Sequence, residues 1–193
     1  MRLYNQWYPA TYDRILSMAN WQKFTADLEA KVVCVFCWMP QAVMNVKHSG
    51  KGKGSLQKSD RFGVQEAYAH VEAAAQYFEK VKTMELLLVD LQDIINAIVG
   101  TCEPVFALFG SAAGSKFLHF SSPRLFPMWD STLRKEARLS DSPQGYFQYM
   151  ELFQSELRNP LNLRHALKEY PNNPVRGWDI HRMRYRGQEQ EEE

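Results

Sequence analysis

Apolar residues return every three or four positions along most of this 193-residue chain, and this is the spacing of one face of an α-helix. We therefore expect amphipathic helices over residues 10–30 and 64–81, and a central helix over 84–99 that is apolar on more than one face. Gly100 fits the C-terminal cap of that central helix, and residues 103–109, which begin Glu-Pro, fit a short further helix. The pattern predicts a mostly α protein.

Cap residues and prolines mark the expected helix boundaries in the last third of the chain. Asp-Ser-Pro at 141–143 predicts a helix that runs to about residue 158, and Asn-Pro at 159–160 predicts its end. Two final helices are expected over 161–170 and 175–186. No internal repeat divides the chain.

The segment 32–39, Val-Val-Cys-Val-Phe-Cys-Trp-Met, is apolar throughout and fits either a buried strand or a core helix. Cys34 and Cys37 within it have CxxC spacing, but the chain has no second such pair to complete a structural zinc site or a four-cysteine cluster. We interpret both as core thiols, and we expect neither a metal nor a cofactor.

Basic residues gather in one segment of a chain whose formal net charge is only +1, so a histone-like polycation is excluded. Residues 47–61 are rich in Gly, Ser and Lys, and they predict a mobile loop that packs into no core. Lys51 and Lys53 in this loop are candidate contacts to a polyanion. A second basic group of arginines lies at 182–186.

Length and composition predict one globular unit over residues 1–187, followed by a disordered acidic tail at 188–193. The odd number of cysteines, three, and the lack of an apolar leader at the N-terminus predict a cytoplasmic protein. No apolar run approaches the roughly 18 residues that a membrane span needs, so we expect a soluble monomer.

The most informative stretch is 110–138, in which a Gly-Ser-Lys step opens one expected helix and Phe-Pro-Met-Trp-Asp precedes the next, over 131–137. This order places Lys116 and Asp130 at two helix starts that can face one site. A helix start attracts anions and disfavours a nearby ammonium, so the helix start, together with partial burial, should lower the pKa of Lys116.

These residues resemble two motifs of the helix-hairpin-helix DNA glycosylases. The first motif is that family's glycine-rich hairpin, L-P-G-V-G-x-K-T-A, and the residues that resemble it are Leu108, Gly110, Gly114, Ser115 and Lys116. The second resembles F-P-V-D-x-x-V-x-R at Phe126, Pro127, Asp130, Leu133 and Arg134. The resemblance implies a two-lobed helical fold with a hairpin near 108–116, and a double-stranded DNA partner. The iron–sulfur cluster that many members carry has no ligands here.

The resemblance gives Asp130 and Lys116 catalytic roles. A carboxylate beside C1′ stabilises the positive charge that forms on the sugar when the base leaves, and Asp130 would supply it. Lys116 would attack C1′ as a neutral amine and form a Schiff base; without that step, Asp130 would activate water. The alternatives are that Asp130 only caps the helix after it and that Lys116 is a surface lysine.

Several neighbouring residues are candidate DNA contacts. Gly110, Gly114 and Ser115 would present backbone N–H groups to a phosphate, and Arg134 would contact phosphate directly. The alternatives are a helix–helix turn without a ligand and a solvated arginine.

Trp129 and His119 are candidate base-pocket residues, because an aromatic ring can stack on a flipped base. For both residues we favour core packing, with His119 hydrogen-bonded.

These features together predict a DNA glycosylase that flips out and excises a damaged or modified base, in repair or in defence against modified phage DNA. One alternative is a noncatalytic DNA-binding module of the same fold. The other is a helical interaction protein whose basic loop has no connection with DNA.

Overall fold

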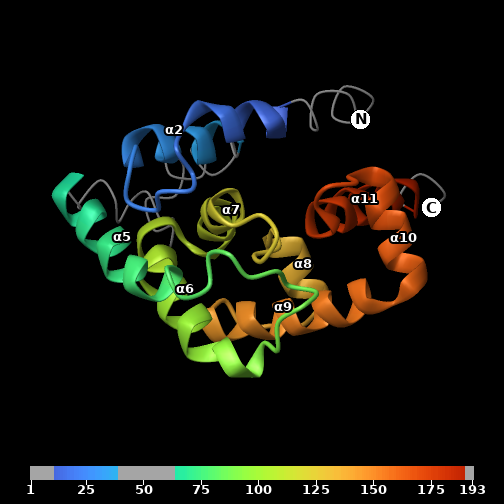
Figure 1. Ribbon diagram of the computed structural model, residues 1–193. Helices are drawn as coiled ribbons and strands as arrows, with labels where there is room; N and C mark the ends of the chain where they lie inside the picture. Colours follow the sequence, from blue (N-terminus) through green and yellow to red (C-terminus); the bar gives the residue numbers. More distant parts are fainter. Residues whose placement is uncertain (1–10, 39–63, 190–193) are drawn as a thin grey trace.

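The computed structural model describes residues 11–38 and 64–189, and every regular element in these two ranges is helical (Figure 1). A first helical segment covers residues 11–18. The elements that follow are α2 (Leu28–Trp38), α5 (Val64–Phe78), a short 3-10 helix η1 (Gln92–Ile94), α6 (Ile95–Phe109), α7 (Ser111–Ser121), α8 (Ser131–Glu136), α9 (Pro143–Arg158), α10 (Pro160–Glu169) and α11 (Pro174–Glu189). The prediction of a mostly α protein is confirmed.

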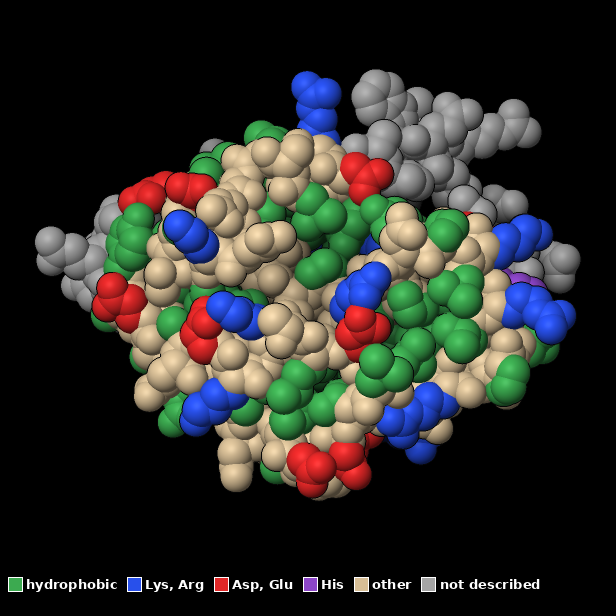
Figure 2. Space-filling view, in the orientation of Figure 1, with side chains coloured by type: hydrophobic (Ala, Val, Ile, Leu, Met, Phe, Trp, Pro, Cys, Tyr) green, Lys and Arg blue, Asp and Glu red, His purple; other side chains and the backbone are tan. Residues whose placement is uncertain are grey.

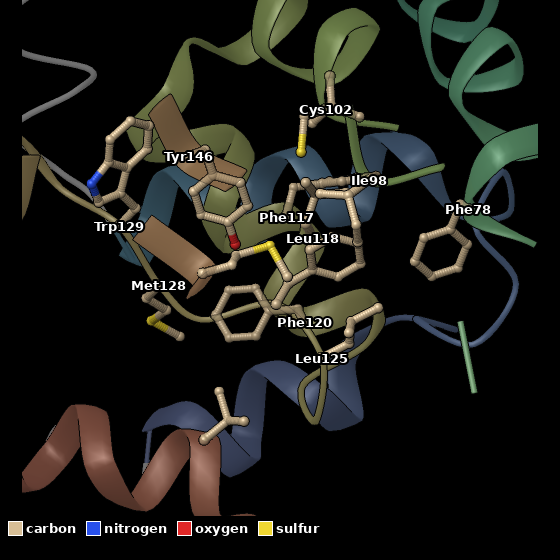
Figure 3. Close-up of a cluster of buried hydrophobic side chains, with 14 of the residues drawn as sticks. Phe78, Ile98, Cys102, Phe117, Leu118, Phe120, Leu125, Met128, Trp129 and Tyr146 are labelled. Atoms are coloured by element: carbon tan, nitrogen blue, oxygen red, sulfur yellow. The ribbon is translucent and has the colours of Figure 1, made fainter. Parts of the chain in front are cut away.

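Helix α7 is the central element of the described chain, and every residue from Ala113 to Ser121 in it is buried. Helices α2 and α6 pack against it, α5 packs on α6, and α10 packs on α11 (Figure 1). Phe117 and Leu118 of α7 lie within a cluster that also includes Phe78 and Tyr146 (Figure 3). Burial of such side chains contributes about 2–3 kcal/mol each, so α7 is the main organiser of the core.

The predicted central helix over 84–99 is wrong. Residues 79–91 run through successive turns, and the regular helix α6 begins only at Ile95. Tertiary contacts replace helical hydrogen bonds in these turns: the Leu86 N–H donates to the Arg124 carbonyl at 3.0 Å, and the Gln154 amide donates to the Val89 carbonyl at 2.9 Å. Leu86 and Leu91 are therefore buried without forming a helix, whereas Leu88 is exposed.

Gly100 is not a helix cap, and no new helix begins at residue 103, because α6 continues through both Gly100 and Pro104. A Cβ added at Gly100 would lie 2.7 Å from Cδ1 of Tyr77. The glycine thus serves the close approach of α5 to α6, a constraint that depends on a residue distant in sequence.

The predicted helix over 10–30 is interrupted. Residues 11–18 are helical, turns follow, and Asp27 takes a left-handed φ of 54° directly before α2. The apolar segment that fitted a strand or a helix is helical through Trp38 as part of α2. Cys34 is buried, as expected of a core cysteine, whereas the side chain of Cys37 lies outside the described part of the chain.

Capping explains why the C-terminal helix boundaries were predictable. The Ser142 hydroxyl accepts a hydrogen bond from the Gly145 N–H at the start of α9, and the Asn159 side chain accepts one from the Leu161 N–H at the start of α10. Proline follows each cap as the first helical residue. The predicted disordered tail begins too early, because α11 extends through residues 188 and 189; residues 190–193 lie outside the described chain.

Charges of both signs are interspersed over the face shown in Figure 2, where Lys and Arg side chains alternate with Asp and Glu. The predicted basic loop at 47–61 lies outside the described residues. In the described ranges, none of the helices is both long and apolar enough for a membrane span.

Candidate functional site

The segment 126–129, which joins α7 to Asp130, is held in place by side chains at each of its four backbone carbonyls. These side chains come from α7 and α9, and all are buried. The carbonyl of Phe126 accepts from His119 Nδ1 at 2.6 Å, that of Pro127 from the Tyr146 hydroxyl at 2.7 Å, that of Met128 from the Tyr149 hydroxyl at 3.2 Å, and that of Trp129 from the Ser115 hydroxyl at 3.0 Å. Side-chain hydrogen bonds from two helices thereby satisfy the carbonyls of a segment that has no regular structure, and they hold its position.

Asp130 follows this segment as the N-cap of α8. Its Oδ1 accepts hydrogen bonds from the N–H groups of Thr132 and Leu133, both at 2.8 Å, and its backbone is extended. The expected capping role is therefore present. The residue is also exposed, so the carboxylate can reach a bound molecule while it caps the helix.

Lys116 is buried, with 9% of its surface exposed, so the surface-lysine alternative does not fit. Its Nζ donates to the carbonyls of Ala112 at 3.3 Å and Trp129 at 3.4 Å. Burial lowers the pKa of Lys116, and the nearby charges of Asp130 and Asp179 oppose that shift. The prediction of a lowered pKa agrees with the structure in direction.

Of the two causes expected for this shift, the structure supports burial and not the helix start. The helix opens at Ser111, not at the Gly-Ser-Lys step, and Lys116 therefore lies in its second turn. The field of a helix start fades within the first turn, so desolvation replaces it as the main cause. The lysine still meets the Asp130 region, because its Nζ reaches the carbonyl of the residue that precedes Asp130.

The glycine-rich connection is shorter than the sequence suggested. Gly110 alone joins α6 to α7, with a φ of 76° that favours glycine. The Gly114 N–H donates to the Gly110 carbonyl at 2.8 Å, and a Cβ at Gly114 would lie 2.6 Å from Phe106. Ser115 is fully buried against Trp129. Helix geometry leaves the N–H groups of residues 111–113 without intrahelical partners, so these, rather than Gly114 and Ser115, are the donors that α7 can offer to a phosphate.

Arg134, a predicted phosphate contact, forms an ion pair with Asp141. The Asp141 carboxylate also accepts a hydrogen bond from the Ser111 hydroxyl at the start of α7. An acidic side chain of the protein thus lies beside the helix start where a phosphate was expected. The other two predicted contacts, Lys51 and Lys53, lie outside the described residues.

His119 is fully buried, and both of its ring nitrogens are engaged. The Phe126 carbonyl can only accept, so Nδ1 carries the proton; Nε2 then accepts from the Tyr12 hydroxyl at 2.8 Å. Burial is the main cause that lowers the pKa of His119 to about 3. This is the geometry of a hydrogen-bonded core histidine, and it leaves neither ring nitrogen to contact a flipped nucleobase.

Trp129 is also buried, and its ring stacks on that of Tyr149 with centroids 5.9 Å apart. Its indole nitrogen points away from the other labelled side chains of the cluster (Figure 3). No hydrogen-bond partner reaches this nitrogen from the described part of the protein. Trp129 is therefore a packing residue, as favoured from the sequence.

Protonation of His119 gives a pH-dependent prediction. The unfolded histidine binds a proton below its ordinary pKa of 6.5, whereas the folded one does so only near 3. The free energy of unfolding should therefore fall as the pH decreases from 6.5 towards 3, by about 1 kcal/mol for each pH unit from this group. Denaturant unfolding of the wild type at several pH values across this window would measure the slope.

The control for this measurement is His119→Gln, whose amide can donate to the Phe126 carbonyl and accept from the Tyr12 hydroxyl but does not titrate. Its unfolding free energy should depend less on pH than that of the wild type. Parallel slopes for the two proteins would contradict the assignment of the acid sensitivity to His119.

Two site residues were missed by the sequence-based prediction, Arg176 and Asp179 of α11. Both are buried, they form an ion pair, and both act electrostatically on Lys116. The only signal in the sequence is their spacing of three residues within an otherwise apolar stretch, Val-Arg-Gly-Trp-Asp-Ile. That spacing also fits an ordinary surface pair, so burial could not be read from it.

A separate pocket of about 720 Å³ is lined by Tyr12 and by segments around residues 22, 83, 123 and 172. Neither Lys116 nor Asp130 lines it. In the described chain no group of three or more His, Cys, Asp or Glu residues is placed to hold a metal ion.

Comparisons with protein-family models, with curated proteins and with solved structures find no match to this chain. The site is therefore defined by its own geometry: a buried lysine amine bonded to the fixed segment that ends at an exposed carboxylate.

Proposed function

We propose that this protein is a DNA glycosylase, which flips a damaged or modified base out of double-stranded DNA and cleaves its N-glycosidic bond. One observation supports this above all others: a buried lysine with a lowered pKa donates to the carbonyl that directly precedes Asp130. Glycosidic cleavage through a covalent Schiff base needs a nucleophilic amine and a carboxylate held close together.

In the proposed reaction, the neutral Lys116 amine attacks C1′ as the C1′–N bond breaks, and the bonding electrons leave with the base. Asp130 stabilises the positive charge on the sugar and can take the proton that the amine loses. The sugar ring then opens to a Schiff base on Lys116. The base must leave the stack first, because its C1′ is shielded within the duplex.

We further propose that the helices correspond to the two lobes of the helix-hairpin-helix glycosylases. Helices α5 to α9 would form one lobe, and the N-terminal helices with α10 and α11 the other (Figure 1). The hairpin would be the α6–Gly110–α7 connection. The protein would act as a cytoplasmic monomer.

The test is base release from a panel of duplexes, each of which holds one oxidised, alkylated, mismatched or glucosylated base. Wild-type protein should produce abasic sites in one of them, and borohydride should trap a covalent DNA adduct. Lys116→Gln should abolish the adduct. The matched control is Lys135→Gln, since Lys135 is an exposed lysine of α8 and its loss should leave trapping unchanged.

The outcomes separate the proposed enzyme from its alternatives. Base release without a trapped adduct would indicate that Asp130 activates water instead of the lysine acting as nucleophile. Salt-sensitive DNA binding without base release from any duplex would contradict the enzyme and favour a noncatalytic DNA-binding module. No DNA binding at low salt would favour a helical interaction protein.

A further inference from the structure

Helix α11 places two charged side chains inside the protein next to the Lys116 site. Arg176 is 0% and Asp179 is 6% exposed, and the two form an ion pair across one helical turn. Removing both charges from water costs several kcal/mol for each ion, so a purely structural contact would be made more cheaply by apolar side chains. Their presence requires a further explanation.

The contacts of Arg176 connect α11 to the segment that precedes Asp130. Its NH1 lies 3.9 Å from Sδ of Met128, and the next residue, Trp129, provides the carbonyl that accepts from Lys116. The guanidinium also stacks over the ring of Tyr12 at 4.4 Å and lies 5.9 Å from that of Trp38. The rings of Tyr12 and Trp38 and the sulfur of Met128 thus contact the guanidinium and hold its position.

Three charges act on Lys116 in this arrangement. Asp130 and Asp179 favour the charged amine, whereas Arg176 opposes it. His119, on the same helix as Lys116, is neutral above acidic pH because burial lowers its pKa to about 3. The nearby phenol of Tyr12 is also neutral, since burial raises its pKa.

The two carboxylates differ in how they are balanced. Arg176 forms an ion pair with Asp179 and opposes its effect on Lys116, whereas Asp130 acts on Lys116 from the exposed end of the 126–129 segment. Without Arg176, Asp179 would be a buried carboxylate that lacks its main counter-ion, and the closest remaining cations would be Lys116 and Arg182. A lysine that must neutralise a buried carboxylate stays protonated and cannot attack.

We infer that Arg176 and Asp179 are positioning residues of the Lys116 site, where Arg176 supplies a fixed positive charge and Asp179 holds the guanidinium beside the 126–129 segment. The role of this ion pair in catalysis rests on the proposed function, because a lysine must be neutral only if it acts as a nucleophile. The electrostatic effect of Arg176 and Asp179 on Lys116 can be tested without DNA.

The experiment is an NMR titration of protein labelled with ¹³C at lysine Cε, in which the Lys116 signal is assigned by its absence from Lys116→Gln. Arg176→Met should raise the ratio of protonated to neutral Lys116 about tenfold at a given pH, because Asp179 then acts on the lysine. Arg176→Lys keeps the charge and should leave the titration of Lys116 near that of the wild type. If Arg176 had only a structural role, the Lys116 titration would not differ between Arg176→Met and Arg176→Lys according to their charge.

A second variant keeps the inference testable if Arg176→Met does not fold. Asp179→Asn removes the carboxylate and should lower the protonated fraction of Lys116 relative to wild type. Unchanged Lys116 titration in folded Arg176→Met and Asp179→Asn proteins would overturn the inference. If the expected titration shifts occur but no duplex loses a base, the proposed function fails while the electrostatic coupling stands.

Discussion

Asparagine in place of Asp130 is expected to reduce base release at least about 100-fold and to leave the fold intact. The substitution removes the negative charge that would stabilise the sugar cation. It retains the cap, because an asparagine side-chain oxygen can accept from the same Thr132 and Leu133 N–H groups. The measurement is single-turnover base release on the best duplex of the panel, with thermal unfolding of the same samples.

Two comparisons make this result specific to the charge at residue 130. Asp93→Asn changes an exposed carboxylate of η1 and should leave base release unchanged. Asp130→Ala removes charge and cap together, so it should lose activity and also about 1 kcal/mol of stability. Wild-type rates in Asp130→Asn would eliminate a catalytic carboxylate at this position and leave only its capping role.

Alanine in place of Gly177 is expected to lower the free energy of unfolding by about 3 kcal/mol or more. A Cβ at this position in α11 would lie 2.0 Å from the carbonyl oxygen of Ala166 and 2.7 Å from its carbonyl carbon. These are backbone atoms of α10, so the two helices would have to separate. Denaturant unfolding monitored by far-ultraviolet circular dichroism would measure the loss.

The matched control is Gly100→Ala, another glycine-to-alanine change inside a helix. Its Cβ would lie 2.7–2.8 Å from Cδ1, Cε1 and Cγ of Tyr77, so a side-chain ring rather than backbone would have to shift, while alanine gains about 1 kcal/mol in helix propensity. The loss of stability should therefore be smaller than that of Gly177→Ala. Equal losses in the two variants would show that helix separation is not the cause.

The Gly177 prediction also bears on the site. Helix α11 is held against α10, and it presents Arg176 and Asp179 to Lys116 from the positions on either side of that close contact. A shift of α11 would move the guanidinium from the rings of Tyr12 and Trp38. A partly folded Gly177→Ala protein should therefore alter the Lys116 titration as well as the stability.

Local chemistry made some parts of the fold predictable from the sequence. Helix periodicity indicated the mostly α class, the caps at Asp130 and Ser142 marked the starts of α8 and α9, and Asn159-Pro160 marked the end of α9. A cap residue and the N–H groups that it binds lie within three residues of one another, so their interaction depends little on the rest of the protein. The lowered pKa of Lys116 was predicted in direction, and of its two expected causes burial acts there whereas the helix start does not.

The errors arose where distant residues decide the local structure. Gly100 was taken for a cap, although it allows the approach of Tyr77, and residues 84–91 were taken for a helix, although contacts from Arg124 and Gln154 hold them as turns. A glycine has the same local pattern whether it caps a helix or lies inside one, and a run of leucines has the same pattern whether it forms a helix or turns. Packing partners far away in the sequence therefore chose between the alternatives.

The sequence by itself determined the helical class, the caps, and the short interval that joins the Lys116 helix to Asp130. Only the tertiary structure decided that Lys116 is buried, that all four carbonyls before Asp130 are held by α7 and α9, and that Arg176 and Asp179 face the lysine. The physical reason is that capping acts between neighbours in the chain, whereas desolvation and Coulomb interactions depend on what the folded chain brings close in space.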